Sequence, residues 1–143
     1  MSRLKIKLPS HFSFTCSLAT RITDINYGGH AGNDTILSMI HEARMQYLQH
    51  LGYSEMEFEG NGLIMADASI EYKNELFYGD IVFISVTAGE VSKIGFELFY
   101  KMEKKEGDKT FPVAYARTGM ICYNYDRKKI VPLAEEARKK LTA

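Results

Sequence analysis

The sequence predicts an α+β fold in which a five-stranded antiparallel sheet is covered by one long helix. Three observations lead to this fold class. Five stretches alternate between apolar and polar side chains, or are apolar and β-branched throughout, as strands are. One segment instead repeats its apolar residues with the period of a helix. The connections between the last four strands are short, which favours antiparallel neighbours.

The five strands are expected at 12–22, 64–73, 81–88, 94–102 and 113–125. The third of these is apolar on both faces and rich in β-branched residues, which is typical of a strand covered on both sides. In the second, alternation places one set of side chains on a common face: Ile64, Ala66, Ala68, Ile70 and Tyr72.

The long helix is expected between the first two strands, with an apolar stripe formed by Ile36, Ile40, Ala43, Tyr47 and Leu51. Asn33 is predicted to be its N-cap, and Gly52 is predicted to stop it. A short second helix is expected after Pro132. Acidic residues at its start and lysines at its end complement the helix dipole.

The composition is that of a globular domain without charge bias. Apolar residues make up 45% of the chain and charged residues 25%, and 18 basic residues balance 18 acidic ones. Without an excess of positive charge, we expect neither nucleic acid nor an anionic membrane as the main partner. The length and the lack of repeats or linkers predict that residues 1–143 form a single domain.

The two cysteines, Cys16 and Cys122, form neither a CxxC pair nor a zinc spacing, so we expect reduced, buried thiols and no metal. The N-terminal residues 1–7 lack an apolar stretch after their charges, which argues against a secretory signal. No apolar run is long enough to span a membrane. These features together favour a cytoplasmic protein.

The stretch richest in chemical information, residues 21–34, joins the first strand to the long helix. Its glycines let the backbone turn sharply and approach a ligand closely. It ends where the free N–H groups of a helix point outward, and such groups stabilise an anion or a developing oxyanion. Its polar side chains can orient water or hold a carbonyl, or they can simply satisfy N–H groups of the loop itself.

Residues 24–33 read Asp-Ile-Asn-Tyr-Gly-Gly-His-Ala-Gly-Asn and resemble the Asp-x-Asp-x-x-Gly-His-Val-Asn-Asn signature of hotdog acyl thioesterases. Residues 41–44 are similar to the family's Glu-x-Ala-Arg, residues 71–80 to its Tyr-x-x-Pro-x-x-x-Gly-Asp, and residues 116–119 to its Ala-Arg-Gly. The resemblance covers about residues 10–142. It is nearest to the 4-hydroxybenzoyl-CoA thioesterase-like and acyl-ACP thioesterase-like branches.

The resemblance implies a hotdog fold, with the sheet wrapped around the long central helix. It also implies hydrolysis of an acyl thioester on coenzyme A or acyl carrier protein, with no metal and no cofactor beyond the substrate's own coenzyme A or phosphopantetheine. In the family, N–H groups at the helix start polarise the thioester carbonyl, and a carboxylate acts as nucleophile or base. Family sites lie between protomers, so a homodimer or homotetramer is implied. The open edges of a five-stranded sheet favour the same conclusion.

The sequence departs from the family at the catalytic carboxylate. The second aspartate of the signature is Asn26, and an amide cannot accept a proton at neutral pH. The asparagine that acyl-ACP thioesterases carry two residues before the histidine is Gly28. A hydrolase would therefore use His30 as its base, or one of Asp24, Asp34 and Glu42. We favour His30, because imidazole titrates near neutral pH.

The candidate catalytic residues are therefore Asp24, Asn26, His30, Asn33 and Glu42. Candidates for substrate binding are Gly29 in the loop, Tyr72, Phe77 and Tyr78 along the pantetheine path, and Lys73, Lys93 and Arg117 at the nucleotide phosphates. Each has a plainer alternative. The carboxylates can brace the loop or form solvated pairs, the aromatic rings can pack, and the basic side chains can simply be solvated.

The sequence leaves three functions to consider. The first is a thioesterase acting on acyl-CoA or acyl-ACP. The second, suggested by Asn26, is a hotdog protein that binds an acyl thioester without hydrolysing it. A hotdog dehydratase or hydratase is disfavoured, because the signatures expected of those enzymes are missing from the sequence.

Overall fold

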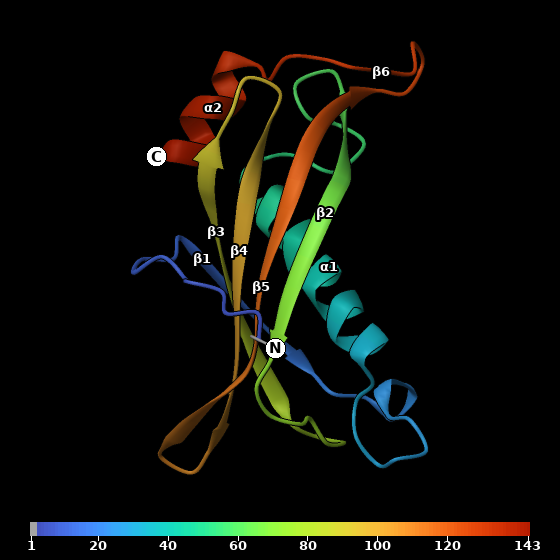
Figure 1. Ribbon diagram of the computed structural model, residues 1–143, viewed down its shortest axis with the longest axis vertical. Coiled ribbons are helices and arrows are strands. Elements are labelled where there is room, and N and C mark those ends of the chain that lie inside the picture. Colours follow the sequence, from blue (N-terminus) through green and yellow to red (C-terminus); the bar gives the residue numbers. More distant parts are fainter. Residues whose placement is uncertain (1–2) are drawn as a thin grey trace.

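The computed structural model describes residues 3–143, so the first two residues of the N-terminal segment considered above lie outside the described residues. Figure 1 shows the helices and strands in their spatial arrangement. In chain order they are β1 (Phe14–Ala19), the 3₁₀ helix η1 (Ile22–Asp24), α1 (Asn33–His50), β2 (Gly62–Tyr72), β3 (Ile81–Val91), β4 (Gly95–Glu106), β5 (Lys109–Asn124), β6 (Lys129–Ile130) and α2 (Glu135–Thr142).

The sheet is antiparallel with the order β1-β3-β4-β5-β2, and the short strand β6 pairs with the end of β5. The two strands joined by α1 therefore lie at opposite edges of this sheet. A connection between opposite edges has to pass across one face, and Figure 1 shows α1 lying on a single face of the strands. The predicted α+β architecture and its antiparallel pairing are confirmed.

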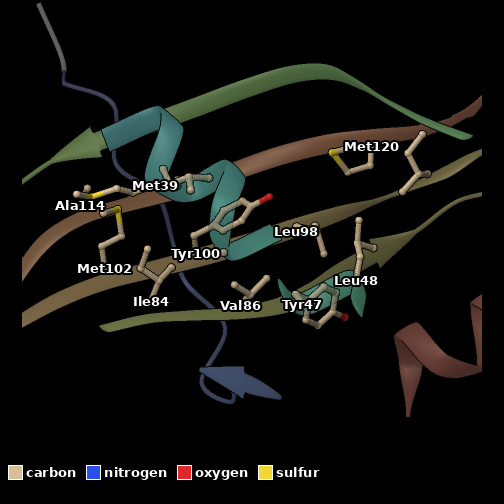
Figure 2. Packing of buried hydrophobic residues seen from close by; sticks show 14 of the residues in the cluster. Met39, Tyr47, Leu48, Ile84, Val86, Leu98, Tyr100, Met102, Ala114 and Met120 are labelled. Atoms are coloured by element: carbon tan, nitrogen blue, oxygen red, sulfur yellow. The ribbon is translucent and has the colours of Figure 1, made fainter. Parts of the chain in front are cut away.

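The core lies between α1 and the inward-facing side chains of β3, β4 and β5 (Figure 2). Ile40 and Leu48 of α1 are completely buried, as the helical spacing predicts. Complete burial of such a side chain contributes about 1.5–3 kcal/mol. The labelled core residues of the sheet in Figure 2 are Ile84, Val86, Leu98, Tyr100, Met102, Ala114 and Met120.

Arg44, in the segment similar to the family's Glu-x-Ala-Arg, is a buried charge inside this core. Its Nη1 donates to the hydroxyl of Tyr100 at 3.3 Å, and its Nε donates to the Glu55 carboxylate at 3.3 Å. The Tyr100 hydroxyl in turn lies 2.7 Å from the hydroxyl of Thr118. A buried guanidinium is tolerated only when it is paired in this way, so the geometry of Arg44 fits a structural role.

The start of α1 differs from the prediction. Gly32 is the N-cap, with φ −74° and ψ 165°, and Asn33 is already the first helical residue. Because glycine has no side chain, no side-chain hydrogen bond caps this end of the helix. At the other end Gly52 follows the last turn with φ +91°, the left-handed conformation that favours glycine, so the predicted stop is confirmed.

The prediction that Ile64 shares a face with the later residues of β2 is wrong, because the strand contains a β-bulge. Met65 pairs with Met120 but Asp67 pairs with Gly119, which leaves Ala66 without a partner in the ladder. An extra residue shifts the alternation by one. Met65 therefore shares the α1-facing side with the later part of the strand, and Ile64 lies on the outer face.

Several strand boundaries also differ from expectation: β3 and β4 continue to Val91 and Glu106, beyond the predicted ends at residues 88 and 102. The first strand ends at Ala19 instead of continuing to residue 22, because the chain turns into η1. The Asp24 carboxylate accepts a hydrogen bond from the backbone N–H of Arg21 at 2.8 Å, and such local bonds compete with strand pairing. The last long strand begins at Lys109, after a two-residue turn in which Gly107 has φ +63°.

Cys122 is buried as predicted, whereas Cys16 is only half-buried because it lies on the edge strand β1. Both thiols are free. Burial raises the pKa of the Cys122 thiol to about 11 and also raises the pKa of Cys16. Both side chains therefore stay protonated near neutral pH, which makes them weak nucleophiles.

Candidate active site

The loop between β1 and α1 is tied at both ends to the loop between β2 and β3. At its beginning, the N–H of Thr20 donates to the carbonyl of Asp80 at 2.8 Å. At its end, the N–H of Ala31 donates to the carbonyl of Leu76 at 2.8 Å. These bonds hold two loops, far apart in sequence, side by side at one end of the sheet.

Asn26 organises the tight turn inside the first of these loops. Its Oδ1 accepts a hydrogen bond from the N–H of Gly28 at 2.9 Å, and its backbone N–H donates to the carbonyl of His30 at 3.0 Å. Gly29, whose φ is +87°, donates to the carbonyl of Asn26 at 3.0 Å. The side chain thus performs the loop-bracing task that sequence reasoning gave as its plainer alternative.

Because glycine has no side chain, Gly28 and Gly32 leave room for polar groups at the start of α1. A Cβ on Gly32 would lie 2.7 Å from the carboxylate of Asp34 and 3.5 Å from Nδ2 of Asn26. A Cβ on Gly28 would lie 3.6 Å from Nε2 of His30. Asn26, His30 and Asp34 therefore surround the chain where it enters the helix.

The first turn of α1 presents free N–H groups to this region. The first helical hydrogen bond of α1 is donated by Ile36 to the carbonyl of Gly32 at 3.2 Å. The N–H groups of Asn33, Asp34 and Thr35 precede it and have no acceptor within the helix. Together with the helix dipole, such groups attract a negatively charged oxygen.

A cavity of about 230 Å³ opens at this helix start, between α1, the end of β2 and the loop that follows β2. It brings together four of the residues predicted from sequence, His30, Asn33, Tyr72 and Lys73. The remaining lining residues are Ala31, Ile36, Asn74, Glu75 and Leu76. We refer to this candidate site as the active-site cavity.

His30 lies in this cavity with one ring nitrogen engaged and the other available. Its Nδ1 is 3.1 Å from the carbonyl oxygen of Ala31, and because a carbonyl only accepts, the N–H is on Nδ1. Nε2 therefore carries a lone pair. The Glu75 carboxylate lies 3.8 Å from Nε2, where it can stabilise the ring once it is protonated.

Glu75 is a candidate functional residue that sequence reasoning missed. It lies inside the stretch 71–80 that is similar to the family's strand and turn, but only the aromatic and basic residues of that stretch were singled out. The signal that could have found it is a carboxylate three residues after the aromatic end of a strand. Its contact with His30 joins residues far apart in sequence, so only the fold reveals it.

A family model described as the thioesterase-like superfamily matches residues 20–141 of the chain. The chain belongs to this superfamily. No curated protein sequence matches the chain.

Solved structures share the fold of this thioesterase-like chain. A 1,4-dihydroxy-2-naphthoyl-CoA thioesterase from Synechocystis is 23% identical, covers 90% of this chain and 95% of its own, and superposes with a TM-score of 0.79. A DHNA-CoA thioesterase from Staphylococcus aureus is 21% identical over 90% of this chain and 89% of its own, with a TM-score of 0.79.

A third similar structure is an Asp-to-Asn mutant of a 4-hydroxybenzoyl CoA thioesterase in complex with 4-hydroxybenzoyl CoA. It is 12% identical, covers 90% of this chain and 97% of its own, and has a TM-score of 0.81. These likenesses confirm the hotdog fold that the sequence resemblance implies, with the antiparallel sheet around the central helix.

Two of the predicted catalytic carboxylates of this thioesterase-like chain, Asp24 and Glu42, lie elsewhere. They line a separate cavity of about 430 Å³ that shares no residue with the active-site cavity. The Asp24 carboxylate accepts from the backbone of Arg21, and the Glu42 carboxylate accepts from Nε2 of Gln46 at 2.8 Å. Both are engaged in local contacts, and the structure does not bring them to His30.

The predicted binding residues also separate into two groups. Tyr72 and Lys73 line the active-site cavity, and Phe77 and Tyr78 lie exposed on the adjoining loop. Lys93 lies at the opposite end of the sheet, between β3 and β4, where its carbonyl accepts from the N–H of Leu133 at 2.9 Å (Figure 1). Lys93 is therefore distant from the helix start.

Arg117 lies on the outer face of β5 between two carboxylates. Its Nη1 donates to Asp67 at 2.8 Å, and its Nε donates to Glu97. Two carboxylates compensate the charge of the guanidinium and occupy its Nε and Nη1 donors, which makes Arg117 a weaker candidate for binding a phosphate. Within residues 3–143 no helix has the length and apolar character needed to cross a bilayer, and no cluster of potential metal ligands is found.

The pair of Arg117 and Glu97 predicts a pH-dependent contribution to stability. Burial raises the pKa of Glu97, but hydrogen bonds from Arg117 and from the N–H of Glu90 outweigh it and keep the pKa below its usual value. Because the folded carboxyl binds its proton less readily than the unfolded one, the pair stabilises the fold above the unfolded pKa. That stability is lost as the pH falls through the lower folded pKa.

We therefore expect Arg117→Met to lower the free energy of unfolding by about 1–2 kcal/mol at pH 7 and by less at pH 3. Urea titrations at both pH values measure the difference. Lys139→Met, which breaks an exposed pair with Glu136 on α2, should stay within about 0.5 kcal/mol of the unmodified chain. An equal loss at both pH values in Arg117→Met would show that the charge pair is unimportant.

Proposed function

We propose that the chain hydrolyses an acyl-CoA thioester to a free acid and a thiol. One observation carries the proposal: the start of α1, which has no side-chain cap, opens into a cavity that also holds the free Nε2 of His30. The helix start supplies donors for a developing oxyanion, and the imidazole supplies a base. Membership of the thioesterase-like superfamily supports the same reaction.

In the proposed reaction the thioester carbonyl oxygen lies against the free N–H groups of the first turn of α1, among them that of Asn33. Attack on the carbonyl carbon moves negative charge onto this oxygen, and donors fixed in advance stabilise it without rearranging. Removal of one such donor from an enzyme typically costs about 2.7–4 kcal/mol of transition-state stabilisation. The backbone supplies these donors, so they depend on where the helix begins and not on the identity of one side chain.

His30 activates the attacking water. Its Nε2 takes a proton as the water oxygen bonds to the carbonyl carbon, and the imidazolium that forms faces Glu75. Breakdown of the tetrahedral intermediate breaks the carbon–sulfur bond. The departing thiolate takes the proton from Nε2, which regenerates the neutral imidazole and releases the acid.

Asn26 favours a second candidate function, binding of an acyl thioester without hydrolysis. Its amide cannot accept a proton, and its Oδ1 is already occupied by the N–H of Gly28. In that case the helix start would hold the thioester carbonyl, and no group would activate water. Hydrolysis assays decide between the two candidates.

The central test is thiol release from a panel of short-chain, long-chain and aromatic acyl-CoAs. Aromatic acyl groups belong in the panel because the similar solved structures include thioesterases named for aromatic acyl-CoAs. We expect hydrolysis of at least one member, and we expect His30→Ala to reduce kcat by about 10²–10⁴-fold. His50→Ala, which changes an exposed histidine at the far end of α1, should keep full activity.

Circular dichroism of both variants checks that they are folded. Full activity in folded His30→Ala would refute the assigned base. Release at the buffer rate for every acyl-CoA, together with tight binding, would favour the non-hydrolytic protein.

Asn26→Asp tests whether the substitution at the family's catalytic position limits the rate. A carboxylate can still accept the Gly28 hydrogen bond, so the turn should persist, and the variant gains a second possible base beside the helix start. We expect turnover in the acyl-CoA assay to equal or exceed that of the unmodified chain. A collapse of turnover would show that the amide itself is required.

We further propose that the chain acts as a homodimer, or as a homotetramer built from two such pairs, formed through β2. Among the described residues 3–143 this strand pairs only with β5, so its outer edge is free there, and Met65 and Tyr72 on its α1-facing side remain exposed. The active-site cavity lies at the end of this edge and is small for an acyl thioester. A partner's edge would complete its wall.

Sedimentation velocity at micromolar concentration tests this assembly, and we expect at least twice the mass of the chain. Met65→Lys places a charge at the pairing edge and should shift the protein toward monomer. Met56→Lys, at an exposed methionine outside the strands, is the matched control. A monomer in the unmodified protein would refute the assembly.

A further inference from the structure

The N-terminal residues 3–13 run across the outer face of the sheet, opposite α1 (Figure 1). We call this segment the N-terminal strap. It is fixed at one end by the N–H of Ile6, which donates to the Glu71 carboxylate on β2 at 3.0 Å. Toward its other end, the ring of Phe12 lies 5.0 Å from the ammonium of Lys101 on β4.

Glu71 joins the strap to the end of β2. One of its oxygens accepts from Ile6, and the other lies 2.8 Å from the ammonium of Lys73. The hydrogen bond from Lys73, followed by that from Ile6, holds the pKa of Glu71 below its usual value. The carboxylate therefore stays ionised at neutral pH and fixes both groups.

Beneath the first residues of the strap is a cavity of about 400 Å³, which we call the strap cavity. Its lining residues are Arg3, Leu4, Ile70, Glu71, Tyr72 and Lys73. Tyr72 and Lys73 also line the active-site cavity, so the two cavities adjoin along the end of β2.

The strap cavity has an excess of positive charge in a chain whose net charge is zero. Arg3 and Lys73 line it, and Lys5 is close enough to contribute to the lowered pKa of Glu71. These are three cations against the one carboxylate of Glu71. In contrast to Arg117, Arg3 is exposed and its planar guanidinium is suited to bidentate contact with a phosphate.

We propose that the strap cavity binds the phosphates of the coenzyme A nucleotide while the acyl end occupies the adjoining active-site cavity. This inference rests on the proposed function, because it assigns the two ends of one thioester to two neighbouring cavities. It makes coenzyme A, with its several phosphates, the thiol carrier. It also gives the strap a direct part in substrate binding.

Calorimetric titration of the full chain with coenzyme A and with adenosine 3′,5′-bisphosphate tests the strap cavity without any need for hydrolysis. We expect the double variant Arg3→Gln with Lys5→Gln to bind both probes about tenfold more weakly, because two charge-assisted contacts are lost. The matched control is Lys128→Gln with Lys129→Gln, two exposed lysines at the turn into β6. It should bind like the unmodified chain.

Kinetics supply the second measurement. The strap variant should show a KM for acyl-CoA raised about tenfold with kcat unchanged. Its kinetics toward the N-acetylcysteamine thioester of the same acid, which has no phosphate, should match those of the unmodified chain. A KM that rises equally for both thioesters would overturn the assignment.

The assignment of the strap cavity and the proposed function are contradicted by different outcomes. If the chain hydrolyses acyl-CoA but the strap variant binds coenzyme A as tightly as the unmodified chain does, the strap cavity does not bind the phosphates. The proposed function then still stands. If the unmodified chain hydrolyses no acyl-CoA but the strap variant binds coenzyme A more weakly, the phosphate-binding role of the strap cavity is supported and the hydrolase function is rejected. Loss of binding only to a phosphopantetheinylated carrier protein would overturn coenzyme A as the carrier.

Discussion

Burial of the apolar stripe of α1 under the sheet is the interaction on which the rest of the structure depends. Each completely buried side chain of this stripe, such as Ile40 or Leu48, contributes about 1.5–3 kcal/mol. A missing N-cap side chain costs only about 0.5–2 kcal/mol. The helix can therefore begin directly after Gly32 with its first N–H groups free, because its stability comes from packing. The opening to the active-site cavity follows from this balance.

The sequence pattern predicted the sheet and the long helix because hydrophobic burial has a different period in each. The pattern did not predict the bulge in β2 or the N-cap of α1, because neither changes the period of the apolar residues. Apolar side chains at Ile64 and Met65 fit either face of β2, so the bulge at Ala66 left no signal in the alternation. Asn33 has the side chain of a good N-cap, but the preceding glycine takes the extended conformation and the capping position.

The candidate site was predictable where its residues are local and unpredictable where they meet through the fold. His30 and Asn33 flank the start of α1 and share its cavity, as their spacing suggested. Glu42 follows Asn33 by nine residues, about 13 Å along a helix, and faces another cavity. Glu75 approaches His30 only because backbone bonds hold two distant loops together.

The end of β2 serves as free edge, as common wall of two cavities and, through Glu71, as anchor for the strap. Tyr72 and Lys73 line both cavities, so a substitution at either residue changes both. At these two positions the shape of one cavity cannot be changed without changing the other. Residues that line only one cavity, such as Ile36 on α1, offer a route by which acyl preference can diverge independently.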